Sequence, residues 1–329
     1  MSSASSDARQ VLIPAAAIPR VSERLEASPH NIELLAWSSD GITTTGGTTV
    51  DDPKPEAAWL TMDLFFSGEF ATMADTIVDL GCVQWVQGFL AGVDAPPFQN
   101  VMGAGIRLSN SDAPNIGVAE YVMSALLSHT HGIAERIDLH RSTTWKQGQW
   151  PELGGQTWLI VGFGSIGHEV AKRARPFGVE IVGARRTAVV DPLADRMVTI
   201  DSLADELATA DAVVLACPLT DETLGMVNRD FLGAMRPDSV LVNVARGAVI
   251  NDDDLIAALD AGNPGAAILD VFDPEPLPEG HPFWSNPAIT VTSHIAGAGM
   301  GIGPRNDSLF LEQLDSYLAG RPLRLEVDS

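Results

Sequence analysis

The stretch LIVGFGSIGHEVAKRARPFGVEIVGARRT, residues 159–187, decides the fold of this chain. An apolar run leads into the pattern G-x-G-x-x-G, formed by Gly162, Gly164 and Gly167, and a helix-like segment and a second apolar run follow. Strand, glycine turn, helix and strand in this order are typical of a Rossmann dinucleotide-binding unit. The first glycine permits the tight turn, the second lets a pyrophosphate approach the backbone, and the third lets helix and strand pack closely. Free amides at the start of the helix would then bind the phosphates.

The second apolar run ends on two arginines, Arg185 and Arg186, where NAD-binding units usually carry an acid. An Asp or Glu at that place binds the ribose hydroxyls of NAD and repels a 2′-phosphate. Two guanidinium groups instead offer forked hydrogen bonds to a phosphate dianion, and we expect no carboxylate at the end of the strand to oppose them. We therefore predict NADP(H) as the preferred cofactor, with NAD(H) possible. The alternative is that both arginines only face solvent.

The rest of the chain alternates short apolar runs with helix-like segments. The apolar runs are QVLIP, IELLAW, AAWLTM and CVQWVQGF before the glycine loop, and AVVLAC, SVLVNVA and AAILDVF after it. This alternation predicts an α/β fold with two doubly wound parallel-sheet domains. Residues 41–56, rich in Gly, Thr and Pro, are predicted to form a surface loop. The three- and four-residue spacing of apolar side chains predicts a long helix over Asp112–Arg141.

A chain of 329 residues, 45% of them hydrophobic, is long enough to form two domains with large cores. We predict a Rossmann nucleotide-binding domain over residues 105–292. It is inserted into a flavodoxin-like substrate domain, which residues 1–104 form together with residues 293–329. Catalysis is expected in the cleft between the two domains.

Composition excludes several kinds of partner. The 43 acidic against 20 basic residues give a net charge of −23, which disfavours binding to nucleic acid or anionic membranes. No run approaches the ~18 apolar residues of a membrane span, and MSSASSDARQ resembles no targeting signal. Cys82 and Cys217 form neither a disulfide framework nor a zinc motif, and His129 and His131 are too close in sequence to share a helix face. We expect a cytoplasmic protein without a metal.

Four later segments extend the pattern: CPLTDETLGMVNRDFLGAMRP, LVNVARGAVINDDDLIAAL, AILDVFDPEPLPEGHPFWSNP and ITVTSHIAG. Together with the glycine loop they resemble the D-isomer-specific 2-hydroxyacid dehydrogenase family, over about Val83–Gly297. The segment VQWVQGFLAGVDAPPF, Val83–Phe98, is most similar to the glyoxylate and hydroxypyruvate reductase branch. The resemblance implies interconversion of a small anionic 2-oxo acid and the D-2-hydroxy acid. With the cofactor preference predicted from Arg185 and Arg186, we expect NADPH-dependent reduction of an acid such as glyoxylate or hydroxypyruvate. The resemblance also implies a homodimer, with the helical region Asp112–Arg141 in the interface.

The resemblance implies three catalytic residues, Arg246, Glu275 and His294. Histidine is a natural proton donor near neutral pH, and a neighbouring carboxylate such as Glu275 favours its protonated form. Arg246 remains charged and can bind a carboxylate with two parallel hydrogen bonds. All three follow predicted strands, where open α/β sheets bind ligands. Ser293 stands where the family usually has proline, which affects the stiffness of the loop but leaves the imidazole available.

Further contacts are implied by the same resemblance. The substrate carboxylate would meet Arg246, His294 and the backbone of Ala91, Gly92 and Val93, since a glycine allows close approach. The cofactor would be bound by the glycine loop, by the two arginines, and by Ser165, Ile166, Cys217, Pro218, Val244, Ala245, Arg246, Asp270 and His294. Asp270 would hold the carboxamide of the nicotinamide, although a role as a helix or turn cap is the alternative.

Several alternatives remain open at this point. Some corepressors resemble the family, so the chain could be a dinucleotide sensor with little turnover. Phosphite oxidation could use the same three residues, whereas formate oxidation is disfavoured because glutamine partners the histidine in that family. Phe65 and Phe66 could line a pocket for the substrate side chain or belong to the core. The sequence identifies neither the physiological acid nor the direction of the reaction.

Overall fold

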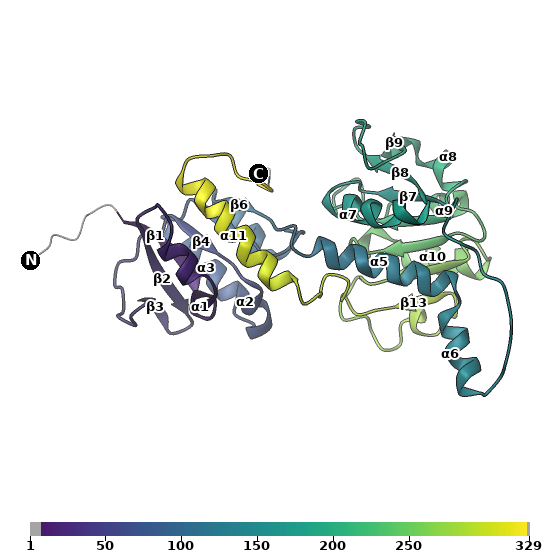
Figure 1. The fold of residues 1–329 in the computed structure, drawn as a ribbon, viewed down its shortest axis with the longest axis horizontal. Helices are drawn as coiled ribbons and strands as arrows, with labels where there is room; N and C mark the ends of the chain where they lie inside the picture. The colour runs from purple at the N-terminus through teal and green to yellow at the C-terminus, as the bar shows by residue number, and fades with distance from the viewer. Residues whose placement is uncertain (1–7, 328–329) are drawn as a thin grey trace, which may run out of the picture. The chain divides into compact units, whose positions relative to one another are not determined.

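The structure, a computed structural model, describes residues 8–327; residues 1–7, where the sequence predicts no targeting signal, and residues 328–329 lie outside that range. The chain forms two compact units, unit 1 (Met1–Pro114 with Met300–Ser329) and unit 2 (Asn115–Gly299) (Figure 1). The sequence places the corresponding boundaries at residues 104–105 and 292–293. Residues 293–299 lie in unit 2 because His294 to Ala296 hydrogen-bond to Asp270.

Unit 1 contains a six-stranded sheet in the order β3-β2-β1-β4-β5-β6. Its strands are β1 (Arg9–Pro14), β2 (Ile32–Ser38), β3 (Gly41–Thr44), β4 (Ala57–Trp59), β5 (Trp85–Gln87) and β6 (Arg107–Ser109). All neighbouring strands are parallel except the pair β2 and β3. Leaving the edge strand β3 aside, this is the order of flavodoxin-like sheets.

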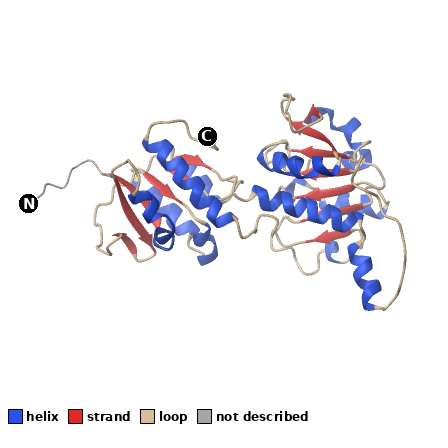
Figure 2. Cartoon of the chain, in the orientation of Figure 1, coloured by secondary structure: helices blue, strands red, loops and turns tan. Residues whose placement is uncertain are grey.

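Helices cover both faces of this sheet (Figure 2). They are α1 (Ile18–Glu26), α2 (Met62–Ser67), α3 (Phe70–Leu80), α4 (Pro96–Gly103) and α11 (Ile302–Leu318). Along β1, Val11 and Ile13 pack with α1 and α11, while Leu12 packs with α2, α3 and α4. This division follows from the two-residue alternation of side chains along a strand.

Unit 2 contains a seven-stranded parallel sheet in the order β13-β12-β11-β10-β7-β8-β9. Its strands are β7 (Thr157–Val161), β8 (Glu180–Arg185), β9 (Arg196–Thr199), β10 (Ala212–Leu215), β11 (Val240–Asn243), β12 (Ala266–Leu269) and β13 (Ile289–Val291). From β9 to β13 this is the Rossmann order with one further strand. The predicted fold class is therefore confirmed. The order reverses between β7 and β10, where such sheets bind their ligands.

The helices of unit 2 also lie on both faces of its sheet (Figure 1). They are α5 (Asn115–Thr130), α6 (Ile133–Arg141), α7 (Ser165–Ala174), α8 (Leu203–Leu207), α9 (Arg229–Ala234) and α10 (Asp252–Asp260). Along β7, Trp158 and Ile160 pack with α5 and α7, while Leu159 and Val161 pack with the cluster that includes α8, α9 and α10. Burial on both faces explains why these strands are continuous apolar runs.

Two local expectations are wrong. Residues 41–44, predicted as loop, form β3, because Gly41, at φ 134°, allows a tight return along β2. The predicted long helix is two helices, α5 and α6, because the chain turns at Gly132 in the left-handed conformation (φ 59°). Within residues 8–327, no helix is long and apolar enough to cross a membrane.

Candidate active site

The three glycines of the loop after β7 have separate structural requirements. A Cβ on Gly162, which has φ 90°, would lie 2.3 Å from the backbone nitrogen of Cys217, so no side chain fits there. A Cβ on Gly167 would lie 3.1 Å from both the carbonyl oxygen of Gly162 and Cγ2 of Ile160, so helix and strand are in close contact. Gly164 is exposed, with no atom within 4 Å of its Cβ position. The loop therefore fits a pyrophosphate at Gly164.

Helix α7 begins at Ser165, directly after Gly164, and no side chain caps this end. Its first backbone N–H groups have no intrahelical acceptors, so they can bind an anion. Ser165 is exposed and Ile166 half-buried at this end. Across the loop, burial raises the pKa of the Cys217 thiol to about 11, so this side chain is an uncharged packing group beside the exposed Pro218.

Arg185, the last residue of β8, does not point freely into solvent. Its Nε donates a hydrogen bond to the carbonyl oxygen of Phe163, and its Nη2 lies 2.9 Å from Nε2 of His168. Nη2 also lies 3.5 Å from Oδ2 of Asp191. The expectation that no carboxylate opposes the arginines is therefore wrong for Arg185, because the chain after β8 returns Asp191 to this position.

His168 and Asp191 are residues that the sequence did not indicate. Nε2 of His168 lies 2.8 Å from Oδ2 of Asp191, so these two residues and Arg185 form one charged cluster beside the glycine loop. Although burial opposes it, hydrogen bonds from the backbone of Leu193 and from His168 hold the pKa of Asp191 below its usual value. The Asp191 carboxylate is therefore ionised near neutral pH and compensates part of the charge of Arg185.

Arg186 differs from its neighbour. It is exposed and forms no hydrogen bond or ion pair within the described range. The charge of Arg186 acts on Glu222, whose pKa is lowered chiefly by a hydrogen bond from Thr220 and further by Arg186. Arg186 can therefore bind an added anion without breaking a contact, whereas Arg185 would share its guanidinium with Asp191.

The three predicted catalytic residues follow three adjacent strands of unit 2. Arg246 follows β11, Glu275 follows β12 and His294 follows β13. Because these strands are parallel, their carboxyl ends lie on the edge of the sheet that carries the glycine loop. The structure brings Glu275 and His294 into direct contact: Oε2 of Glu275 lies 2.8 Å from Nδ1 of His294. Their side chains are 36% and 53% exposed, so solutes can reach the imidazole.

The loop that carries Arg246 is fixed by the buried side chain of Asn243. Oδ1 of Asn243 accepts a hydrogen bond from the N–H of Ala245, and its Nδ2 donates to the carbonyl oxygen of Arg246, both at 3.0 Å. Val244 and Ala245 are buried in this turn. A Cβ on Gly247 would lie 1.9 Å from the backbone of Phe272, so Gly247 allows the Arg246 loop to contact the segment before Glu275.

Asp270 holds the His294 loop. Its carboxylate is 1% exposed and accepts hydrogen bonds from the N–H groups of Ile295 (3.0 Å) and Ala296 (2.8 Å) and from the hydroxyl of Thr292 (2.6 Å). Its backbone oxygen accepts a bond from the N–H of His294. These contacts support a capping role for Asp270, and they leave about one of the four lone-pair positions of the carboxylate for another donor.

His294 itself has φ 52°, a left-handed conformation that costs a bulky residue about 1–3 kcal/mol. Because the Thr292 hydroxyl donates to the Asp270 carboxylate, its oxygen must accept the second short contact, 2.6 Å from the Tyr121 hydroxyl. Burial raises the pKa of Tyr121, which keeps this donor protonated. The strained backbone of His294 is thus held from α5 through Tyr121, Thr292 and Asp270.

The predicted substrate loop, residues 90–94, belongs to unit 1 and is described there alone. Ala91, Gly92 and Val93 are half-buried, and their backbone N–H groups donate no hydrogen bond to residues in the described range. Phe65 and Phe66, on α2, are 57% and 79% exposed. The alternative that these two aromatic side chains belong to the core is therefore wrong.

Comparisons with known proteins agree with this geometry. The family model "D-isomer specific 2-hydroxyacid dehydrogenase, NAD binding domain" matches residues 123–296. An uncharacterised protein of the proB 3′ region of Corynebacterium melassecola is 33% identical, with 89% of this chain and 95% of that protein covered. Human glyoxylate reductase/hydroxypyruvate reductase is 31% identical, with coverage of 72% and 74%. A D-isomer specific 2-hydroxyacid dehydrogenase family protein from Aeromonas salmonicida has a TM-score of 0.76 at 24% identity, with coverage of 97% and 99%.

The Rossmann sheet, the glycine loop and these relatives define the chain as an NAD(P)-dependent oxidoreductase. It belongs to the D-isomer-specific 2-hydroxyacid dehydrogenase family, in the glyoxylate and hydroxypyruvate reductase branch. The family and the enzyme class predicted from the sequence are confirmed.

Proposed function

We propose that the protein reduces a small 2-oxo acid, such as glyoxylate or hydroxypyruvate, to the D-2-hydroxy acid with NADPH. In this reaction, 2-oxo acid, NADPH and one proton give 2-hydroxy acid and NADP⁺. The observation that carries the proposal is the 2.8 Å contact between His294 and Glu275, on the sheet edge that also carries Arg246 and the glycine loop. A proton donor and a fixed cation on one edge suit the reduction of a carbonyl beside a carboxylate.

His294 is the proposed acid. Oε1 of Glu275 accepts the N–H of Phe272, and its Oε2 faces Nδ1 of His294, so we assign Nδ1–H of His294 as the donor to this carboxylate. Nε2 then remains for the substrate oxygen and delivers its proton as the alkoxide forms. When bound, the reduced nicotinamide supplies the hydride. Arg246 would polarise the carbonyl and bind the carboxylate, aided by the N–H groups of Ala91, Gly92 and Val93.

We infer that NADP(H) is preferred over NAD(H). The open space at Gly164 and the uncapped start of α7 at Ser165 and Ile166 would take the pyrophosphate. Arg186, with support from Arg185, would bind the 2′-phosphate. The remaining contacts proposed from the family resemblance are those of Cys217, Pro218, Val244, Ala245, Arg246, Asp270 and His294. In this assignment unit 2 (Asn115–Gly299) binds the nucleotide, and unit 1 forms the substrate domain.

A panel of 2-oxo acids of increasing size, assayed with NADPH and with NADH, tests the proposal. We expect turnover of the smallest acids with NADPH. Tight NADPH binding without oxidation by any acid would contradict the proposal and indicate a dinucleotide sensor. Oxidation of phosphite in place of 2-hydroxy acids would indicate that the same residues serve another reaction.

Reductase activity is expected to fall as the pH rises. In the Glu275→Gln variant this fall should begin at a lower pH than in the wild type. The reason is that His294 must be protonated to act as an acid, and glutamine removes the negative charge that favours this form. Rate measurements across the pH range with saturating NADPH give the profile. Asp273→Asn, which removes a neighbouring carboxylate, is the control, and an unmoved profile in Glu275→Gln would contradict the pairing.

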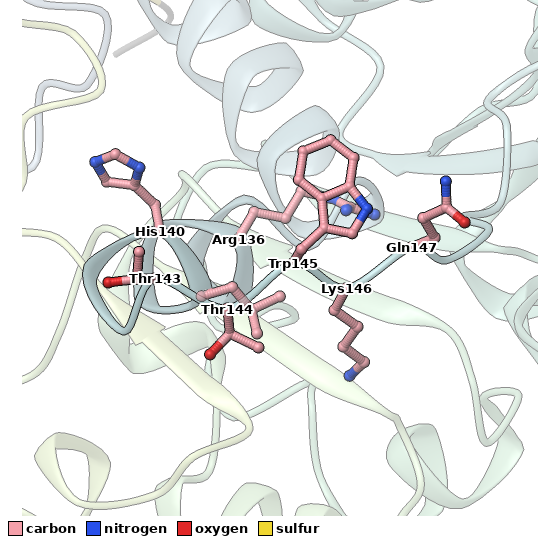
Figure 3. A pocket seen from close by; sticks show the side chains of 8 residues that line it. Arg136, His140, Thr143, Thr144, Trp145, Lys146 and Gln147 are labelled. Atoms are coloured by element: carbon pink, nitrogen blue, oxygen red, sulfur yellow. The ribbon is translucent and has the colours of Figure 1, made fainter.

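We also propose a homodimer that uses α6 and the segment after it. Ile133 and Ile137 on this helix are 38% and 45% exposed, and Trp145 and Trp150 are 90% and 49% exposed. Trp145 also lines a hollow of about 520 Å³, together with Arg136 and His140 (Figure 3). Such an apolar surface is typical of an interface. Light scattering should give twice the chain mass of 34.9 kDa, and Trp145→Ser should lower it; a monomeric wild type would contradict this.

A further inference from the structure

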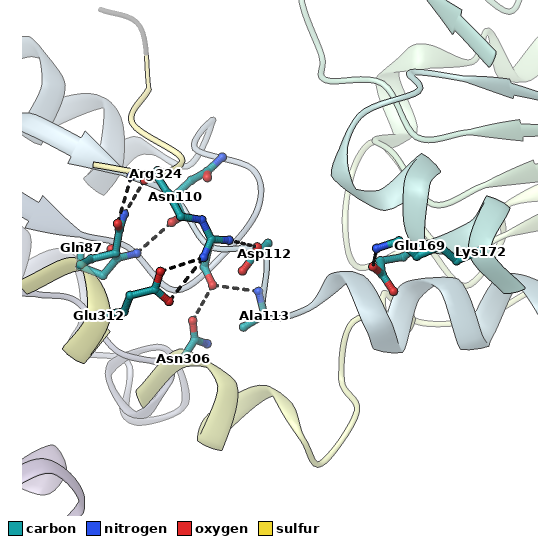
Figure 4. A network of polar contacts seen from close by, with 11 residues as sticks. Gln87, Asn110, Asp112, Ala113, Glu169, Lys172, Asn306, Glu312 and Arg324 are labelled. Atoms are coloured by element: carbon teal, nitrogen blue, oxygen red, sulfur yellow. Dashed lines mark hydrogen bonds and ion pairs between the residues drawn. The ribbon is translucent and has the colours of Figure 1, made fainter. Parts of the chain in front are cut away.

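A set of side-chain amides lies beneath the loop of residues 88–94 in unit 1. They belong to Gln87 at the end of β5, Asn110 directly after β6, and Asn306 on α11 (Figure 4). Gln87 and Asn306 are 1% and 4% exposed, and neither belongs to the catalytic residues described above. Most buried amide groups are hydrogen-bonded, so the partners that the N–H groups of these side chains bind are informative.

Each of the three amides donates a hydrogen bond to a backbone carbonyl of the loop, and the backbone of Ser111 binds a fourth carbonyl. Nε2 of Gln87 donates to the oxygen of Gly88 (2.8 Å), and Nδ2 of Asn306 donates to that of Phe89 (3.2 Å). The backbone N–H of Ser111 donates to the oxygen of Leu90 (2.9 Å), and Nδ2 of Asn110 donates to that of Ala91 (2.8 Å). Four consecutive carbonyl groups, those of residues 88–91, therefore bind to the interior of unit 1.

The orientation of the buried amides is fixed by their surroundings. Nε2 of Gln87 also lies 2.8 Å from the carbonyl oxygen of Asn110, so the opposite assignment would place oxygen against oxygen. Oδ1 of Asn306 accepts the hydroxyl of Ser111 at 2.6 Å, which leaves its Nδ2 for Phe89. The amides of Gln87 and Asn306 are consequently donors to the loop.

The direction of the loop N–H groups follows from these contacts. In a planar trans peptide the carbonyl and the next N–H point in opposite directions. Because the oxygens of Phe89, Leu90 and Ala91 bind inward, the N–H groups of Leu90, Ala91 and Gly92 point away from the interior of unit 1. These three N–H groups donate no hydrogen bond to any residue between 8 and 327, so they form a row of free donors.

We propose that Asn306 and Gln87, together with Asn110, are positioning residues for the substrate carboxylate. They act by holding the carbonyl groups of residues 88–91. The N–H groups of Ala91 and Gly92, two of the three already assigned to the substrate carboxylate, and that of Leu90 beside them are thereby presented to the carboxylate before it binds. The inference rests on the proposed function, since it assigns this loop to the 2-oxo acid. Prepared donors strengthen anion binding because no reorganisation is needed when the ligand arrives.

Ion pairs fix α11 to the same region. Arg324 contacts Asp112 at 3.0 Å and Glu312 at 3.2 Å, and Nε of Arg305 donates to the carbonyl oxygen of Ala113 at 2.8 Å. The segment that follows β6 is thereby held against the helix that supplies Asn306, as Figure 4 shows for Asp112, Glu312 and Arg324. This explains how a residue near the end of the chain can control the loop after β5.

The test replaces Asn306 with Leu, whose side chain has the same number of heavy atoms and the same branching at Cγ but cannot donate a hydrogen bond. We measure kcat/KM for glyoxylate and for its methyl ester, and the dissociation constant of NADPH by fluorescence. The value for glyoxylate should fall at least about tenfold, as expected for a charged hydrogen bond that is no longer well oriented. The ester carries no carboxylate, so its value should change much less. NADPH binding, which the proposal assigns to unit 2, should remain within about twofold of the wild type.

Gln87→Met is the second variant and should also lower kcat/KM for glyoxylate much more than for the ester. With this variant the test does not depend on whether Asn306→Leu folds. Asn100→Leu, on the exposed surface of α4 in the same unit, is the matched control and should leave all three values unchanged. Equal losses for acid and ester in both variants would overturn the inference, because they would indicate a role in stability alone. A wild type that reduces no 2-oxo acid would instead overturn the proposed function.

Discussion

Replacing His294 with Ala should lower turnover of a 2-oxo acid by about 10²–10⁴-fold, which is the usual contribution of a positioned acid or base. The imidazole follows β13 and is held by Glu275 at 2.8 Å, while its backbone is bound to Asp270. Alanine at this position removes the proton donor but leaves the glycine loop unchanged. NADPH binding, measured by fluorescence, should therefore be largely intact.

His30→Ala is the control for this variant. His30 pairs with Asp315 on the surface of unit 1, at 3.1 Å, and has no proposed part in the reaction. Its replacement should leave turnover unchanged within about twofold. Near-normal turnover of His294→Ala would contradict the assignment of the acid, even if the fold and the cofactor preference were as proposed.

The second large effect concerns the cofactor. Combining Arg185→Asp with Arg186→Ser should lower kcat/KM for NADPH by at least about tenfold per lost contact, since charged hydrogen bonds contribute about 1.5–3 kcal/mol each. With NADH, kcat/KM should stay level or rise, because a carboxylate at the end of β8 can bind the ribose hydroxyls. The ratio of the two values is the quantity to compare, because the introduced carboxylate would also lie beside Asp191 and could lower both.

The single variant Arg186→Ser measures the contribution of Arg186 to NADPH binding without changing Arg185 or its contacts. Arg186 has no hydrogen bond or ion pair within residues 8–327, so its loss should affect only the added phosphate. Arg229→Ser, at an arginine of unit 2 whose side chain is 85% exposed, is the matched control. A wild type that already prefers NADH, or a double variant with the wild-type ratio, would contradict a role for either arginine.

The fold and the strand-end residues were predictable because both depend on short segments of sequence. The apolar run and the glycine spacing around Gly162 are a local sequence pattern. Parallel strands place their carboxyl ends at one edge of the sheet, independently of the conformations of the loops. The order β13-β12-β11 therefore places Glu275 and His294 after neighbouring strands at the same edge of the sheet. The break at Gly132 was missed because the apolar spacing continues across it, although glycine allows the left-handed turn that separates α5 from α6.

The contacts that orient the site could not be predicted in the same way. Ser111 and Asn306 are hydrogen-bonded although 195 positions separate them, and Tyr121 and Thr292 are 171 positions apart. Nothing in the pattern around an isolated Asn or Tyr indicates which distant residue it will meet. Asp191 is closer to Arg185 in sequence, but the irregular segment between them has no periodicity from which its return could be inferred.

In the proposed reaction, the protein transfers a hydride from NADPH to the C2 carbon of a 2-oxo acid. The most direct measurement is the reduction of hydroxypyruvate with two samples of deuterated NADPH. Each sample carries deuterium at C4 of the nicotinamide, on one face of the ring in the first sample and on the other face in the second. We predict that one sample gives D-glycerate with deuterium at C2, and that the other gives the unlabelled D acid. Formation of the L acid, or NADPH that binds and is not oxidised, would contradict this claim.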